Sequence, residues 1–438
     1  MSEGSSKKLL GFWDLMGISL GQIIGTGVVV LTGISISMTG YGAPWAFIFA
    51  LAIVAIPTIC IAALGSAVPN TGGNYTYVRD FLGPRTSFLY LSLLISGQVI
   101  LASFAIGFAE YASELFPGIN LTFTAAFIMV LCYLANLFGI KTAARFQSIM
   151  VLVLVGSLIF YILSGFGHIE DYSHYGSGND VFPNGFGGFF AAAFLLRLSL
   201  IGSEFVSEFG GEMENPGKTI PLVMGLSLLL VVMLYIGIAI VATGVLPLEE
   251  VLGKNLAATA EVVFSPPVYI AFIGGGIMIS LVTSLNAIFA WCTRGLYMAT
   301  EDGWLPIKLA AKNKYGTPYI YLTVFFIVGI TPILTGLSLE YVSILGNAVG
   351  AIFGLFPVVA LFNLSNRNPE AYKKAPFKLP VWATKLFPMI AVVIYGYGIY
   401  SSWDFIGNTG WFMLASYVVL IIGYISIRQK HVRACQEN

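Results

Sequence analysis

The chain has 438 residues, of which 57% are hydrophobic and only 10% are charged, whereas an ordinary soluble domain is about 25% charged. This composition excludes a soluble globular protein and indicates a polytopic integral membrane protein. The formal net charge of zero gives no indication of a nucleic-acid partner. Cys60, Cys132, Cys292 and Cys435 are too scattered for a disulfide framework or a metal cluster, so we interpret them as core thiols.

Apolar runs of about twenty residues, the length of helix that crosses a bilayer, recur along the whole chain. They predict twelve membrane spans in an all-α protein. The predicted spans are 11–38, 43–67, 85–115, 122–141, 144–166, 186–210, 220–245, 267–299, 318–336, 340–364, 382–402 and 410–428. Because the number is even, both termini lie on the same side of the membrane.

The distribution of Lys and Arg predicts which side that is. Outside the predicted spans, every Lys and Arg except Lys254 falls in a tail or loop on the side of the termini. Basic loops stay in the cytoplasm. We therefore predict a multi-pass protein of the cell (cytoplasmic) membrane with both termini in the cytoplasm.

The first predicted span contains an unusual concentration of glycine. Gly17, Gly21 and Gly25 recur every four residues, a pattern that lets two helices pack closely. Gly27 breaks this period and encloses Thr26 between two glycines. Two flanking glycines favour a short unwound turn, whose free backbone groups must face protein or a cavity rather than lipid. Close packing and unwinding are compatible interpretations of this span.

A second stretch of the same character, Leu198–Glu204, lies midway along the span 186–210. Interrupted helices at corresponding places in two halves of a chain indicate the central binding site of a transporter. Between the later spans, 246–266 has helical periodicity without the length to cross a membrane and predicts a short external helix. The segment 301–316 is a basic cytoplasmic connection.

Four motifs together resemble the amino acid/polyamine/organocation (APC) superfamily of permeases. They are Ile-Gly-Thr-Gly-Val at 24–28, Pro-Asn-Thr-Gly-Gly-Asn-Tyr-Thr-Tyr at 69–77, Gly-Glu-Met-Glu-Asn-Pro-Gly-Lys-Thr-Ile-Pro at 211–221, and Arg294–Tyr297 with Asp-Gly-Trp-Leu-Pro at 302–306. The resemblance implies one permease domain over 1–438 with the leucine-transporter fold. In that fold 11–166 and 186–364 are inverted repeats of five helices, whose helices 1 and 6 are broken, and 382–428 forms two peripheral helices.

The resemblance also implies where a substrate binds. A broken helix exposes N–H groups that suit a carboxylate and carbonyls that suit an ammonium, and an α-amino acid carries both. The implied substrate-binding residues are Ile23, Gly25, Thr26, Gly27, Leu198, Ser199, Ile201, Gly202 and Ser203. For Ser199 and Ser203, the alternative is a hydrogen bond back to a carbonyl of their own helix.

Several residues are candidates for gating or ion coupling. Glu204 and Glu208 follow the second break, where carboxylates are costly enough to suggest function. Some relatives carry a lysine in span 5 in place of a sodium ion, but this chain has Leu154 there. Thr283 and Ser284 supply hydroxyls where sodium-coupled relatives place ligands. Tyr235 resembles the tyrosine that partners the missing lysine, although a buried tyrosine is also common as a packed ring.

Arg197 is the only basic residue predicted at membrane depth, since the other Lys and Arg that fall within span bounds lie near span ends. An unpaired arginine at that depth is costly, so it must face protein or a water-filled cavity and have a partner. It lies about two helical turns before Glu204, which makes a direct ion pair a possible arrangement. Two interpretations stay open: Arg197 holds the broken helix together, or it selects an acidic or strongly polar substrate.

The sequence thus predicts a secondary transporter for L-amino acids that works by alternating access, either as an exchanger or as an ion-coupled symporter. An amine or polyamine antiporter of the same fold and a transporter-like membrane sensor are the alternatives. No cluster of acid–base or metal-binding residues lies at membrane depth, so we expect no enzyme activity and no bound metal. We expect no cofactor beyond a coupling Na⁺ or H⁺, and the lipid bilayer and the amino acid as partners, without nucleic acid or an obligate protein partner.

Overall fold

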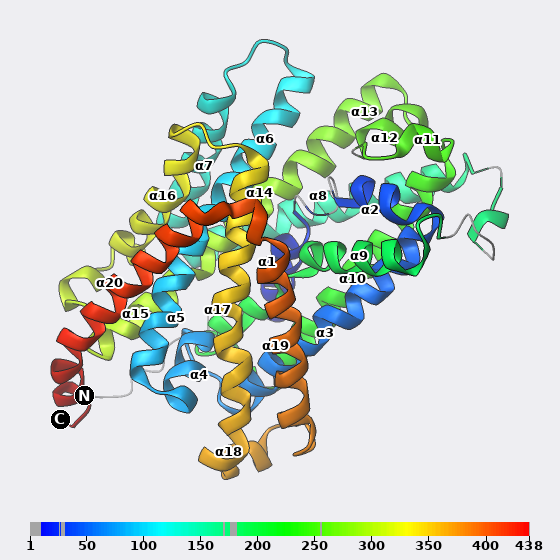
Figure 1. The fold of residues 1–438 in the computed structure, drawn as a ribbon. Helices are drawn as coiled ribbons and strands as arrows, with labels where there is room; N and C mark the ends of the chain where they lie inside the picture. Colours follow the sequence, from blue (N-terminus) through cyan, green and yellow to red (C-terminus); the bar gives the residue numbers. More distant parts are fainter. Residues whose placement is uncertain are drawn as a thin grey trace.

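The computed structural model describes residues 10–25, 27, 31–169, 171–175, 182–254 and 256–437, without the side chains of residues 141, 430, 431 and 433–437. Within this part of the chain all regular structure is helical, and the β contacts are two isolated bridges, Leu10 to Met213 and Thr71 to Phe209. Figure 1 shows the helices packed as one bundle with α1 in its middle. The protein is therefore all-α, as its sequence predicts.

The helices of the first half are α1 (Phe12–Ile23), α2 (Thr32–Thr39), η2 (Gly40–Gly42), α3 (Ala43–Ala67), α4 (Gly73–Leu82), α5 (Pro84–Gly97), η3 (Gln98–Ile100), α6 (Leu101–Leu115), α7 (Leu121–Leu137), α8 (Ile140–Phe166), η4 (Ser173–Tyr175), α9 (Gly185–Leu196), η5 (Arg197–Leu200) and η6 (Ser203–Glu208). Those of the second half are α10 (Pro216–Gly244), α11 (Leu248–Val251), α12 (Ala257–Val263), α13 (Pro266–Phe272), η7 (Ile273–Met278), α14 (Ile279–Trp291), α15 (Thr293–Glu301), η8 (Ile307–Ala310), α16 (Tyr319–Leu334), α17 (Leu339–Arg367), α18 (Pro369–Lys374), α19 (Ala383–Ser401) and α20 (Trp403–Glu437). The η elements are 3₁₀ helices except η7, which is a π-helix.

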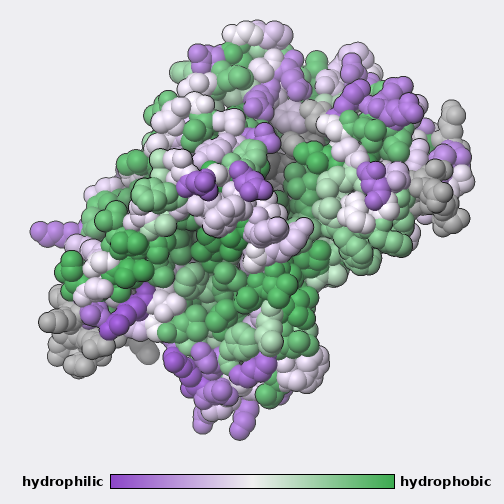
Figure 2. Space-filling model, viewed as in Figure 1, coloured by the Kyte–Doolittle hydropathy of each residue, from purple (hydrophilic) through white to green (hydrophobic). Residues whose placement is uncertain are grey.

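Nine helical segments of the described chain are long and apolar enough to cross a membrane. They are Thr32–Ala67, Pro84–Leu115, Thr142–Phe166, Gly185–Glu208, Pro216–Gly244, Pro266–Glu301, Leu339–Arg367, Ala383–Ser401 and Trp403–Gln429. Figure 2 shows the corresponding surface, a broad hydrophobic belt between hydrophilic ends. The protein is accordingly a multi-pass membrane protein.

The structure divides some of the predicted spans differently. The 12 residues of α1 cover only about 18 Å, because an α-helix rises about 1.5 Å per residue. The helices α7 and α16 are also apolar but short, with 17 and 16 residues. The 3₁₀ turn at Gly40–Gly42 joins α2 directly to α3. The end of the first predicted span and the whole second predicted span therefore form one helical segment. The twelve-span count therefore stays a prediction.

Both apolar segments that the sequence predicts to be interrupted are interrupted. The first ends as an α-helix at Ile23, and α2 begins at Thr32. The second changes from α to 3₁₀ geometry at Arg197 and turns at Gly202. Gly202 has a φ of 140°, a conformation that residues with a side chain rarely adopt. Glycine is thus the residue that permits the second interruption.

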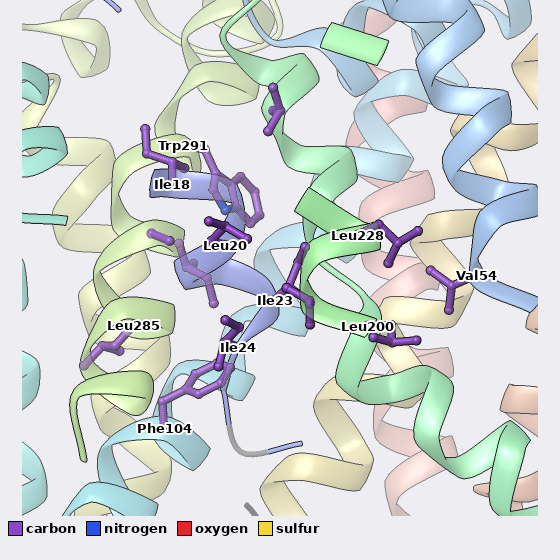
Figure 3. Packing of buried hydrophobic residues seen from close by; sticks show 14 of the residues in the cluster. Ile18, Leu20, Ile23, Ile24, Val54, Phe104, Leu200, Leu228, Leu285 and Trp291 are labelled. Atoms are coloured by element: carbon purple, nitrogen blue, oxygen red, sulfur yellow. The ribbon is translucent and has the colours of Figure 1, made fainter. Parts of the chain in front are cut away.

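The glycines of α1 also permit close packing. A β-carbon at Gly17 would lie 2.9 Å from the Ser148 Oγ of α8, and one at Gly21 would lie 2.0 Å from the Gln147 Nε2. Figure 3 shows the side chains that surround the end of α1, with Phe104 from α6, Leu228 from α10, and Leu285 and Trp291 from α14. Close packing and unwinding therefore occur in one segment.

The structure also bears on the predicted external helix and on the predicted core thiols. The loop at 246–266 contains two short helices, α11 and α12, instead of one. Gly253 follows α11 with a φ of 68°, which ends the helix. Cys60, Cys132 and Cys292 are buried and unpaired, while the side chain of Cys435 lies outside those described.

Candidate functional site

A cavity of about 140 Å³ lies where the end of α1 meets η5 and η6. Its other walls come from α3, α4, α5, η3, α6, α14, α17 and α19. It is lined by Gln22, Ile23, Gly25, Gly27, Ile61, Asn74, Tyr90, Gly97, Gln98, Ile100, Phe104, Arg197, Leu198, Ser199, Ile201, Glu204, Phe205, Ile288, Trp291, Gly346, Asn347, Gly350, Ala351, Phe353, Gly354, Pro357 and Tyr395. Both interrupted helices thus contribute backbone to one cavity.

The structure brings many of the predicted site residues together here and places others behind the walls. Those that line the cavity are Ile23, Gly25, Gly27, Arg197, Leu198, Ser199, Ile201 and Glu204. Those that do not are Leu154, Gly202, Ser203, Glu208, Tyr235, Thr283 and Ser284. Thr26 lies outside the described residues.

The two interrupted helices touch at Gly27 and Ser199. A β-carbon at Gly27 would lie 2.3 Å from the Ser199 Cβ and 2.5 Å from its Cα, distances that no packed structure tolerates. The Ser199 hydroxyl donates a hydrogen bond to the Leu196 carbonyl, at 2.6 Å. Ser199 therefore bonds back to its own helix, three residues earlier, while the buried Ser203 Oγ has no partner among the described atoms.

Tyr235 of α10 bridges the two interruptions from behind. Its hydroxyl lies 3.4 Å from the carbonyl oxygens of both Ile23 and Ser199 and can donate to either one. Its fully buried ring packs against Phe47, with centroids 5.3 Å apart. At 3.4 Å these are long hydrogen bonds. The tyrosine that Tyr235 resembles partners a lysine, which this chain lacks. Tyr235 instead contacts the carbonyls of the two interrupted helices directly.

Oxygen atoms of α1 and α14 converge beside the same break. The Ser284 hydroxyl contacts the Gly21 carbonyl at 2.9 Å and the Ile24 carbonyl at 3.2 Å. Thr283 instead donates to Ser280 within its own helix, at 2.8 Å. Leu154 of α8 is fully buried. Ser284 therefore ties α14 to the backbone at the end of α1, while the Thr283 hydroxyl is engaged within its own helix.

Clusters that could hold a metal ion are absent from the part of the chain that the structure describes, where no three His, Cys, Asp or Glu side chains come together.

Glu204 and Glu208 have different surroundings. Glu204 lines the cavity, and its Oε2 accepts a hydrogen bond from the Gly202 N–H at 2.8 Å. Glu208 is buried outside the cavity and accepts from the Asn74 N–H at 3.1 Å, while its carbonyl accepts from the Gly72 N–H. A carboxylate at the start of a helix is stabilised by its free N–H groups. Glu208 thus holds the beginning of α4 against η6.

An aromatic pair closes one wall of the cavity. The rings of Phe205 and Trp291 stack with their centroids 3.9 Å apart and nearly parallel planes. The Trp291 indole donates to the Gln22 Oε1 at 3.0 Å, so the last turn of α1 is tied to the end of α14. Sequence reasoning did not find this group, because aromatic residues in apolar spans give no signal that separates a cavity wall from a packed core.

Polar residues from other helices complete the lining, and sequence reasoning missed them too. They are Gln22, Asn74, Tyr90, Gln98, Asn347 and Tyr395. Amide side chains inside otherwise apolar spans, such as Gln98 and Asn347, were the available signal, since polar groups at membrane depth face protein or water.

Ion pairs join the segments that carry the family-like motifs. Arg294 pairs with Glu212 at 2.7 Å, with its guanidinium over the Phe209 ring. Arg79 of α4 pairs with Asp302 at 3.0 Å, and Asp302 also accepts from the Tyr75 hydroxyl at 2.7 Å. Burial, together with the Asp302 carboxylate, raises the pKa of Tyr75 well above its usual value. Tyr75 therefore stays protonated and keeps donating to Asp302.

The comparisons with known proteins identify the family of the chain. Residues 10–431 match the family model described as amino acid permease. The branched-chain amino acid permease BcaP of Bacillus subtilis is 27% identical, covering 99% of this chain and 96% of its own length. The methylthioribose transporter of the same organism is 24% identical over 98% and 96%. The serine/threonine exchanger SteT, also from Bacillus subtilis, is 25% identical over 84% and 87%.

The family match covers nearly the whole chain, and the relatives are transporters rather than enzymes. A cavity between two interrupted helices, inside a bundle with a hydrophobic belt, is the architecture that such transporters use. The chain therefore belongs to the amino acid permease family.

Proposed function

We propose that this protein moves L-amino acids across the cytoplasmic membrane by alternating access, and that the substrate binds in the cavity between α1 and η5–η6. The observation that carries the proposal is the meeting of two interrupted helices at one cavity of about 140 Å³. Interrupted helices expose backbone N–H and C=O groups, which suit the carboxylate and ammonium of an amino acid. Amino acids are also named as substrates of the relatives BcaP and SteT.

The α-carboxylate and α-ammonium bind at the α1 end of this cavity. Gly25 and Gly27 leave the backbone bare there, and we include Thr26, which lies outside the described residues. The carbonyls of Ile23 and Ser199 come from the two different helices. Leu198 and Ile201 line the cavity. Gly202 and Ser203, at the turn behind it, leave space for the side chain of the substrate. The side chain of the substrate then extends toward α17.

The fold proposed for this mechanism has twelve spans. The segments 11–166 and 186–364 form two inverted repeats of five, each with its first helix broken, and 382–428 forms two peripheral helices. Both termini lie in the cytoplasm. Cysteine accessibility at Lys254, compared with Lys378, tests this orientation, since the two positions are proposed to lie on opposite sides.

Transport is coupled to Na⁺ or H⁺, or proceeds by exchange. For sodium, the carbonyls of Gly21 and Ile24 and the hydroxyls of Thr283 and Ser284 are the residues that would hold the ion. For a proton, Glu204 and Glu208 are the acidic groups of η6. Arg197 inside the cavity disfavours the alternative of an amine or polyamine antiporter, because a fixed cation repels a cationic substrate.

Counterflow in proteoliposomes tests this function. Each of the twenty amino acids is offered with and without sodium, at two pH values, beside a polyamine and methylthioribose. Protein-free liposomes provide the background. Accumulation of at least one amino acid supports the proposal. Binding without flux would indicate a sensor, and accumulation of the polyamine or the sugar alone would assign another substrate class.

A further inference from the structure

Arg197 brings an unpaired positive charge to the wall of the cavity. The residue is 4% exposed and begins η5. Its Nε is buried without a hydrogen-bond partner, and the described residues form no ion pair with its guanidinium. The centroid of the Phe194 ring lies 4.3 Å from the Arg197 Cζ, and Tyr395 of α19 also interacts electrostatically with the guanidinium. A buried cation without an anion costs several kcal/mol, so Arg197 needs an anionic partner that the described residues do not supply.

Glu204 does not supply it. Both side chains line the same cavity, but the Glu204 carboxylate is turned to the Gly202 N–H at 2.8 Å. The direct pair that the sequence allows is therefore not formed. Two opposite charges face one cavity and remain apart, so each is free for a ligand.

The guanidinium is held in a shaped position. A β-carbon at Gly398 of α19 would lie 2.3 Å from the Arg197 Nη2 and 3.8 Å from the Ala351 Cβ of α17. On its other side, Phe194 packs edge-on against Tyr397, with centroids 4.4 Å apart. Because a side chain at position 398 would take its place, the slot for Arg197 exists only with glycine there.

This slot lies away from the α1 end of the cavity. The Arg197 guanidinium lies against Gly398 of α19, whereas Gly25 and Gly27 lie at the α1 end, where they contact Ser284 and Ser199. α17 and α19 run side by side in Figure 1, in front of α1. A ligand whose backbone groups sit at α1 therefore reaches Arg197 with its distal end.

Nearby groups favour a ligand that also donates hydrogen bonds. The Gln98 Oε1 and the Asn74 Oδ1 are buried without a donor, and both residues line the cavity. The Gln98 amide is fixed by its own bond to the Leu94 carbonyl at 3.1 Å. The cavity thus offers one fixed cation at its distal end and carbonyl acceptors along the way.

From this arrangement we infer that the substrates are amino acids with a carboxylate in the side chain, and that Arg197 binds that distal carboxylate. The inference rests on the proposed function and names the substrate class of the same site. Arginine presents a planar fork that a carboxylate fills with two hydrogen bonds. Aspartate and glutamate are the amino acids that carry such a group beyond the α-carbon.

Counterflow with matched substrates tests the inference. Aspartate and glutamate are compared with asparagine and glutamine, which have the same shape without the charge. The wild type is expected to accumulate the acids at least tenfold better than the amides. Arg197→Met keeps the length of the side chain without the charge, and is expected to lose roughly ten- to a hundredfold for the acids and less than threefold for the amides.

A second variant perturbs Arg197 without changing a charge. Gly398→Ala displaces the guanidinium from its slot and is expected to lower the uptake of the acids severalfold while that of the amides is retained. Gly396→Ala on the same helix is the matched control, because a β-carbon there meets nothing within 4 Å. It should behave as the wild type with all four substrates. Melting temperatures of all variants are measured in detergent, with and without aspartate.

Several results would overturn the inference. A wild type that accumulates neutral amino acids but not acids removes it and leaves the proposed function standing. An equal loss for acids and amides in Arg197→Met would place the α-carboxylate on Arg197 instead. If Arg197→Met does not fold, unchanged substrate ranking in Gly398→Ala and Arg197→Lys would reduce Arg197 to a scaffold. If the wild type accumulates no amino acid at all, the proposed function itself fails.

Discussion

Gly27 and Ser199 lie so close that there is no room for a side chain between them: a β-carbon at position 27 would lie 2.3 Å from the Ser199 Cβ. The contact joins the two interrupted helices at the cavity. We expect Gly27→Ala to lower transport at least tenfold, because one of the two backbones must move. The measurement is counterflow, normalised to the amount of folded protein.

Gly225→Ala is the control for that substitution. Gly225 lies in α10 with open space around it, so the same change should leave transport and stability unaltered. Near wild-type transport by Gly27→Ala would show that the cavity between the two breaks is not the path of the substrate.

The second prediction concerns Tyr235, whose hydroxyl bridges the two interrupted helices. Tyr235→Phe keeps the ring against Phe47 and removes the hydroxyl that contacts the Ile23 and Ser199 carbonyls. A net hydrogen bond contributes about 0.5–1.5 kcal/mol, and bonds of 3.4 Å belong at the low end. We expect a small loss of thermal stability and a severalfold change in the apparent KM for the substrate.

The same substitution elsewhere separates these two effects. Tyr161 is also fully buried, and its hydroxyl bonds to Thr259 at 2.6 Å. Tyr161→Phe should destabilise the protein by about 1 kcal/mol without a change in KM. An unaltered KM in Tyr235→Phe as well would mean that its hydroxyl serves stability alone.

The third prediction concerns sodium. Since Leu154 stands where some relatives place a lysine, no fixed ammonium replaces the ion, and we expect uptake to fall when sodium is replaced by choline. Leu154→Lys should make uptake less dependent on sodium. Leu154 is fully buried, and a buried lysine readily loses its charge, so folding is checked first.

Equal uptake by the wild type in sodium and choline would rule out sodium coupling. Ser284→Ala serves as the companion variant, because it removes one hydroxyl of the donor set while leaving the charge of the site unaltered. In a sodium-coupled protein it should raise the sodium concentration for half-maximal uptake severalfold.

The fourth prediction concerns the aromatic wall. Gln22→Leu removes the acceptor of the Trp291 indole and leaves the stack with Phe205 in place. A buried donor that loses its acceptor costs about 1–3 kcal/mol. We expect a lower melting temperature and slower transport, with the tryptophan fluorescence shifted. An unchanged melting temperature and rate would show that α1 does not depend on this tie to α14.

The breaks in the helices could be predicted from the sequence because their cause is local. Glycine changes the backbone wherever it stands, and Gly27 and Gly202 mark their turns without any knowledge of the fold. The substrate-facing role of these turns was inferred from the pairing of two such stretches. Gly398 illustrates the opposite case, since nothing in α19 indicates that Arg197 needs its missing side chain.

The partners of individual side chains could not be predicted in this way. From the sequence, Tyr235 resembles the partner of a lysine that this chain lacks, or is a packed ring, and its contact with two carbonyls depends on how α10 crosses α1. Gln98 and Asn347 meet at the cavity only because η3 and α17 face each other. A hydropathy pattern records that such residues avoid lipid, but the direction in which each one points is set by packing.

The close approach of Gly17 and Gly21 to α8 has a mechanical consequence. The side chains of Ser148 and Gln147 on α8 lie directly against the bare backbone of α1, so the two helices have no room to slide and we expect them to move together as one rigid body. α2, on the far side of the break, packs instead against α9. Spin labels on α8 and α9 should therefore report a movement of α1 relative to α2 as a change in their separation when substrate is added.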